Sequence, residues 1–147
     1  MGTYDQFSVG DRFHTPARTL DDETVHALIA HGGFTHPLFT DAEFAASTGF
    51  GGIVLPAQAV LMVMGGLVEQ SGRFDRTTIA LTGFDSVRFL KPVSAGDTIR
   101  TEVEVLGKED TPSGARGVLV MSWRCVKGGG EPVAEATVRM LFTRGDR

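Results

Sequence analysis

The chain has 147 residues, of which 41% are hydrophobic and 22% are charged, and its formal net charge at pH 7 is −4. A chain of this length predicts a single domain over residues 1–147, long enough to bury a substantial core. The 14 basic residues form no conspicuous run beside the 18 acidic ones, so we expect no nucleic-acid partner. The first 13 residues are polar and lack the apolar core of a secretion signal.

A single cysteine, Cys125, lies within a predicted strand. One thiol excludes an intramolecular disulfide and favours a cytoplasmic location. We predict that this thiol is buried and structural, because thiols in apolar surroundings are inert.

The first third of the chain predicts turns and short helices. Val9-Gly10-Asp11 is typical of a turn before a short extended piece. The acidic run Asp21–Glu23 suits the start of a helix, and Gly32-Gly33 suits its end. The sequence Thr40-Asp41-Ala42-Glu43 has the form of a capping box, which predicts a second, short helix.

One long apolar helix is predicted over about residues 56–71, because a proline is well placed at a first helical turn. No charged side chain occurs from Ala57 to Val68. A helix that is apolar on every side should be buried on every side. Its dozen or so apolar residues are fewer than the roughly 20 needed to cross a bilayer, so we expect no membrane partner.

The second half of the chain predicts strands. Ile99–Val105 and Val133–Phe142 alternate between apolar and polar residues, and Ile79–Leu90 and Val118–Val126 are strand-like. Short turns between these runs predict an antiparallel meander. One face of such a sheet needs an apolar cover, which only the helix near residues 56–71 supplies. The sequence therefore predicts an α+β fold in which a curled antiparallel sheet wraps one buried helix.

This order of elements resembles the hot-dog fold, and three stretches resemble its MaoC-like dehydratases and (R)-specific enoyl-CoA hydratases. The first stretch is Val9–Asp11. The second is His36–Leu38 with Asp41–Ala45 and Gly49–Val54, and the third is Val87–Val93 with Gly96–Thr98. The resemblance implies an acyl thioester of CoA or of a carrier protein as substrate. It also implies a homodimer or a dimer of dimers, with sites at the subunit interface. We expect no cofactor and no metal.

The resemblance implies an Asp/His dyad within a pattern of the kind D-x-N-P-(I/L)-H-x-D. When Pro37 is aligned with the proline of that pattern, Phe34 takes the Asp position and Phe39 takes the His position. His36 takes the Asn position, and Asp41 alone is retained. Since hydration of an enoyl thioester needs a base and an acid within hydrogen-bond reach, two phenylalanines exclude the usual dyad reaction.

A second family segment resembles F-x-x-x-I-V-H-G-M, in which the glycine N–H holds the thioester carbonyl. Aligned from Phe50, this segment places Pro56 at the His position, Ala57 at the Gly position and Gln58 at the Met position. Proline has no N–H, whereas Ala57 keeps its amide. The resemblance thus implies substrate-binding positions at five residues: Phe34, Phe39, Pro56, Ala57 and Gln58.

His36 and Asp41 are the candidates to replace the dyad. His36 is either a displaced base or a side chain that makes a local hydrogen bond. Asp41 is either an acid or a charge at a helix N-terminus. Gln58 can reach a thioester carbonyl or a loop backbone, since a buried polar side chain needs partners.

Other polar residues are expected to have structural roles. His31 suits the C-terminal end of a helix, where a cation is favoured. His14 and His26 are predicted to lie at the surface. Arg88 is predicted to point outward from its strand, or to bind a phosphate of the substrate.

Three functions remain open. The first is an enzyme for hydration, dehydration or a related proton shift on acyl thioesters, with a modified site. The second is a catalytically lapsed subunit that binds an acyl chain or supports an active, related hot-dog partner subunit. The third is a thioesterase or another small-molecule biosynthetic enzyme, because one fold can host several chemistries.

Overall fold

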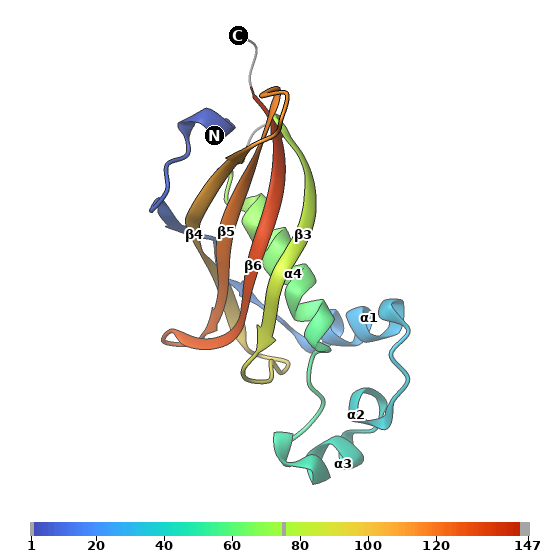
Figure 1. The fold of residues 1–147 in the computed structure, drawn as a ribbon. Coiled ribbons are helices and arrows are strands. Elements are labelled where there is room, and N and C mark those ends of the chain that lie inside the picture. Colours follow the sequence, from blue (N-terminus) through green and yellow to red (C-terminus); the bar gives the residue numbers. More distant parts are fainter. Residues whose placement is uncertain (1, 75, 145–147) are drawn as a thin grey trace.

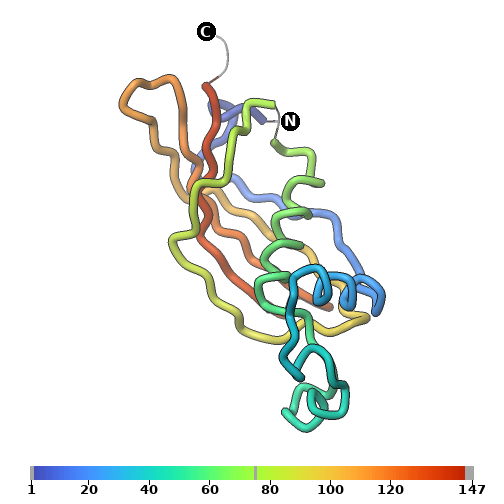
Figure 2. Tube along the Cα trace, turned by 90° about the vertical axis from the view of Figure 1, so that its right-hand side faces the viewer, coloured from blue at the N-terminus to red at the C-terminus, as the bar shows by residue number. Residues whose placement is uncertain are grey.

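A computed structural model describes residues 2–74 and 76–144. It contains a curled antiparallel sheet with the long helix α4 (Ala57–Gln70) packed along its concave side (Figures 1 and 2). The predicted α+β arrangement is therefore confirmed. The strands are β1 (Arg12–His14), β2 (Arg18–Thr19), β3 (Thr78–Phe89), β4 (Thr98–Asp110), β5 (Arg116–Lys127) and β6 (Glu131–Thr143). The remaining helical elements are η1 (Tyr4–Gln6), α1 (Asp22–Gly32), α2 (Pro37–Thr40), α3 (Ala42–Ala45) and η2 (Ala46–Phe50).

The strand order of the sheet is β1-β4-β5-β6-β3, with β2 beside β4. The predicted meander is thus correct for β4, β5 and β6 but wrong for β3, which pairs with β6 rather than with β4. The chain between β3 and β4 crosses past the start of α4 to the other side of the sheet. There the N–H of Leu55 donates to the carbonyl of Val93 at 2.7 Å. Because of this crossing, β3 and β4 lie toward opposite edges of the curled sheet, with α4 between them on its concave side.

One side of α4 remains open. Val63, Met64 and Leu67 are buried, but Gln58 is exposed and Met62 is 59% exposed. The prediction that this helix is buried on every side is therefore wrong for the isolated chain. The reason is the position of β3 at the edge of the sheet, where no further strand of the described residues covers the helix. No helix in the described part of the chain is long and apolar enough to cross a membrane.

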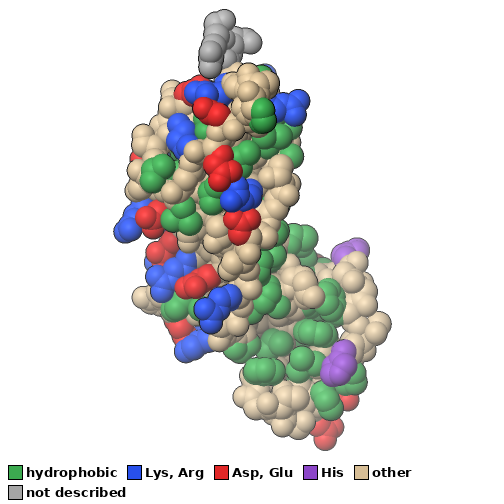
Figure 3. All heavy atoms as spheres, viewed as in Figure 1, with side chains coloured by type: hydrophobic (Ala, Val, Ile, Leu, Met, Phe, Trp, Pro, Cys, Tyr) green, Lys and Arg blue, Asp and Glu red, His purple; other side chains and the backbone are tan. Residues whose placement is uncertain are grey.

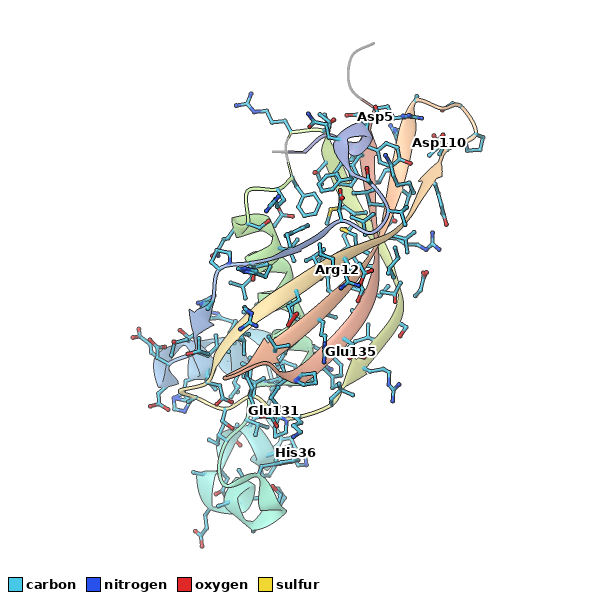
Figure 4. All side chains as sticks on the ribbon, turned by 90° about the vertical axis from the view of Figure 1, so that its left-hand side faces the viewer. Asp5, Arg12, His36, Asp110, Glu131 and Glu135 are labelled. Atoms are coloured by element: carbon cyan, nitrogen blue, oxygen red, sulfur yellow. The ribbon has the colours of Figure 1, made fainter. Side chains whose placement is uncertain are left out.

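The end of the sheet farthest from α2 and α3 is closed by Tyr4. Its ring lies so close to Gly117 that a Cβ at that position would be 2.3 Å from a ring atom. The hydroxyl of Tyr4 donates to Asp110, and Arg144 pairs with both Asp110 and Asp5. Figure 4 shows Asp5 and Asp110 together at this end, while His36 lies at the opposite one.

Cys125 is fully buried in β5, as predicted. Burial raises the pKa of its thiol to about 12. In the unfolded chain the same thiol loses its proton at about pH 8.5. Above that pH the unfolded state binds fewer protons than the folded state, so the free energy of unfolding falls as the pH rises.

We expect Cys125 to lower the free energy of unfolding by about 1.4 kcal/mol per pH unit above about pH 9. Urea unfolding of the wild type and of Cys125→Ala at several pH values above 8 measures this contribution. The other titrating groups cancel when the free energies of unfolding of the two proteins are subtracted. A difference between the two proteins that stays constant with pH would contradict the prediction.

Candidate functional site

The end of α1 fixes the position of Phe34. Gly33 adopts φ 74°, a left-handed conformation that favours glycine. Its N–H donates to the carbonyl of Ala30, and the N–H of Phe34 donates to the carbonyl of Ile29 at 3.1 Å. These two bonds form a Schellman motif, which turns the chain back against its own helix. Phe34 is therefore held rigidly beside the last turn of α1.

His36 and Asp41 cap the two short helices that follow. The Nδ1 atom of His36 accepts a hydrogen bond from the N–H of Leu38 at 3.0 Å, so a neutral ring carries its proton on Nε2. One carboxylate oxygen of Asp41 accepts from the N–H groups of Glu43 and Phe44, both at 3.0 Å. The predicted capping box at Thr40 is wrong, because Asp41 makes these bonds while the hydroxyl of Thr40 donates to the carbonyl of His36.

The two positions that the resemblance aligns with the family dyad lie in contact. The rings of Phe34 and Phe39 meet edge to face, with centroids 5.4 Å apart and an angle of 70° between their planes. Neither side chain can donate or accept a proton. His36 and Asp41 are both exposed on the protruding segment that contains α2 and α3 (Figure 1).

The first turn of α4 offers free backbone donors. The carbonyl of Pro56 accepts from the N–H groups of Ala59 and Val60 at 2.9 and 3.1 Å. No acceptor is recorded among the described residues for the N–H of Ala57 or of Gln58. Donors at a helix N-terminus carry a partial positive charge and attract a developing negative charge. Within the described residues, the N–H of Ala57, which the resemblance implies as a donor, is therefore left without an acceptor of its own chain.

A cleft of about 320 Å³, called here the Ala57 cleft, lies beside this turn. Its walls come from α2, the end of η2, the start of α4 and the chain that leaves β3, and nearly all of its lining side chains are apolar. Lys91, the cation among its described lining residues, is paired with Glu131. Figure 3 shows apolar side chains gathered where the protruding segment meets the body, whereas charged ones spread over the strands. Its lining residues include Leu38, Phe39, Phe50, Val54, Leu55, Ala57, Val60, Phe89, Leu90 and Lys91.

A second hollow, of about 270 Å³, lies at the junction of α1 and α4 and is called here the His31 hollow. Phe34 lines this hollow, and Phe39 lines the Ala57 cleft. The touching phenylalanine rings therefore stand between the two spaces. His31 and Gln58 are the polar side chains of the hollow, and its other lining residues are Leu28, Gly32, Phe34, Ala59 and Met62.

His31 lines this hollow, a position that the sequence alone does not predict. From the sequence, its position at the end of α1 predicts only a favourable interaction with the helix dipole. The spacing held a second signal, because His31 follows the apolar Leu28 by three residues and so lies on the same face of the helix. That face is the one that packs toward α4.

Comparison with known proteins identifies related sequences. Residues 7–121 match the family described as "MaoC like domain". Mesaconyl-CoA hydratase from Cereibacter sphaeroides is 33% identical over 115 residues, which cover 74% of this chain and 31% of that protein. The chain spans less than a third of the length of the curated relatives that it matches.

Solved structures show the same fold. A monoamine oxidase regulatory protein from Archaeoglobus fulgius is 29% identical and superposes with a TM-score of 0.89, covering 98% of this chain and 95% of its own. The (R)-hydratase PhaJ1 from Pseudomonas aeruginosa is 24% identical, with a TM-score of 0.74 over 97% of this chain and 86% of its own. The predicted hot-dog fold is confirmed.

Proposed function

Because the chain belongs to the MaoC-like dehydratase family, we propose that it acts on an acyl thioester, of CoA or of a carrier protein, bound in the Ala57 cleft. The observation that carries this proposal is the free N–H of Ala57 at the start of a 14-residue helix, beside an apolar cleft. Such a donor can hold the thioester carbonyl, while the apolar walls contact the acyl chain. The name of the Cereibacter relative supports a CoA thioester as substrate.

The proposed reaction is of the hydratase or dehydratase type, with a site that lacks the usual dyad. Addition of water across an enoyl thioester puts negative charge on the carbonyl oxygen, which the Ala57 amide would stabilise. Phe34, Phe39 and Pro56 would shape the binding site without exchanging protons. We propose that His36 and Asp41 act by capping the segment that carries Phe39, since Nδ1 of His36 and Oδ1 of Asp41 already accept backbone hydrogen bonds.

A catalytically lapsed subunit is the second candidate function. The contact between Phe34 and Phe39 supports it, because this apolar pair takes the positions that the resemblance aligns with the dyad. Such a chain would bind an acyl thioester, or support a related subunit that carries an intact dyad, without turnover of its own. We keep a cytoplasmic location and a single domain over residues 1–147 as parts of both proposals.

The absorbance of crotonyl-CoA measures the first candidate directly, because hydration removes the enoyl chromophore. Turnover of crotonyl-CoA, or of another member of a panel of enoyl and 3-hydroxyacyl thioesters, is the expected result. Binding of acyl-CoA by calorimetry without turnover of any member would establish the lapsed subunit instead. A protein that neither binds nor converts these thioesters would overturn both candidates.

We also propose that the chain forms a homodimer through β3 and the open side of α4. A groove of about 630 Å³ runs between these elements. Apolar side chains are exposed along it, since Ile79, Leu81 and Phe84 are 44%, 43% and 39% exposed. The free edge of β3 can pair with the same edge of a second copy, which would bring the two Met62 faces together. A second copy would thus supply the cover that the helix lacks.

A further inference from the structure

Two exposed polar side chains share an apolar hollow next to the Ala57 cleft. His31 ends the last turn of α1, and Gln58 lies in the first turn of α4. Within the described residues, no hydrogen bond or ion pair is recorded for the ring of His31 or for the side-chain amide of Gln58. The other side chains of the hollow are apolar. A few convergent polar groups in an apolar pocket are typical of a site where chemistry is done.

The other histidines are less suited to this role. Nδ1 of His36 is occupied by the N–H of Leu38, and the ring of His14 contacts the carbonyl of Thr15 at 3.3 Å. His26 lies on α1, one turn and more before His31, and it is absent from the lining of the His31 hollow. Within the part of the chain that the structure describes, His31 is therefore the histidine that combines ring nitrogens without a protein partner with a place at this hollow.

The hollow also lies close to the carbonyl-holding donor. Ala57 and Gln58 are consecutive residues of α4, so the N–H of Ala57 and the side chain of Gln58 belong to the same turn. Phe34 and Phe39, which touch each other, line the hollow and the cleft respectively. Ala57 lines the cleft and Gln58 lines the hollow, so an acyl group whose carbonyl is held at Ala57 would extend its α- and β-carbons along the first turn of α4 toward His31.

We propose that His31 is the proton-transferring side chain of this chain and that Gln58 positions the water beside it. This inference rests on the proposed hydratase-type function and names the residue that replaces the dyad. The imidazole takes a proton from water while the water oxygen bonds to the β-carbon of the enoyl thioester. The electrons of the C=C bond move toward the carbonyl at Ala57, and the imidazolium then gives its proton to the α-carbon. Water is thereby added across the double bond and the imidazole is regenerated.

Hydration of crotonyl-CoA, or of the best substrate in the panel, by His31→Ala tests the proposal. We expect kcat to fall about 100-fold or more, the usual contribution of a general acid–base. Added imidazole is expected to restore part of the lost rate, because the truncated side chain leaves room for it in the hollow. His26→Ala, a change at an exposed position on the same helix, should retain the wild-type rate.

The outcomes separate this inference from the proposed function. Wild-type turnover that survives in His31→Ala would overturn the role of His31 alone. A loss of turnover that imidazole does not restore, in a protein with wild-type circular dichroism, would also overturn proton transfer by this residue. A wild type without turnover would overturn the proposed reaction and this inference together.

Discussion

Replacing Ala57 with proline is expected to lower kcat/KM for the thioester substrate by about 100- to 1,000-fold, the usual cost of losing one oxyanion donor. Proline removes the N–H and little else, because a first helical position tolerates its ring and its fixed φ. Pro56, which would precede the new proline, already has ψ 139°, the extended conformation that a following proline requires. Steady-state hydration of the best enoyl-CoA substrate measures the effect.

Ala57→Ser is the matched control, since it alters the side chain but keeps the backbone N–H. It should retain most of the wild-type rate, and both variants should unfold within a few degrees of the wild type. If the chain binds without turnover, the proline variant should instead bind acyl-CoA about 3- to 10-fold more weakly, as for the loss of one hydrogen bond. Wild-type kinetics in Ala57→Pro would show that this amide does not hold the carbonyl.

A charge on β3 is expected to dissociate the homodimer. In Leu81→Asp the two new carboxylates would lie near the symmetry axis, in an interface that is otherwise apolar. Loss of an apolar anchor residue costs at least about 2 kcal/mol, so the dimer dissociation constant should rise by about 30-fold or more. Light scattering after size exclusion distinguishes a 15.7 kDa chain from a particle of twice that mass.

Leu106→Asp is the control for this experiment. Leu106 lies on β4 and is 45% exposed, close to the 43% of Leu81, but it is remote from the edge that β3 forms. The control variant should remain a dimer at concentrations where Leu81→Asp is monomeric. A monomeric wild type, or equal dissociation by both variants, would contradict the proposed interface.

Much of the fold could be predicted because its signals are local. The alternation in Ile99–Val105 and Val133–Phe142 predicted β4 and β6, and Gly33 ends α1 where the sequence indicated. The place of β3 could not be predicted in this way, because periodicity identifies a strand but not its neighbour. The same limit explains α4: its apolar sequence predicted full burial, but no local pattern says whether the cover comes from its own chain.

The candidate site was predicted less completely. The structure brings the rings of Phe34 and Phe39 into contact, while their alignment with the family dyad stays a prediction. The residue that caps α3 was harder to predict, because Thr40 and Asp41 are adjacent and both are favourable N-cap residues. The place of His31 beside α4 could not be predicted, because it depends on how two helices cross, which no local spacing reveals.

The pairing of β3 has a consequence for how the chain folds. β3 ends at Phe89, whereas its partner β6 begins at Glu131, so β4 and β5 both emerge from the ribosome before β3 can join the sheet. Pairing strands that are far apart in the sequence requires closing a long loop, which is slow. Folding dominated by such strand pairs takes about milliseconds to seconds. During that interval β3, which carries apolar side chains, is unpaired along both of its edges. Nascent chains are therefore most prone to aggregate just before β6 is complete.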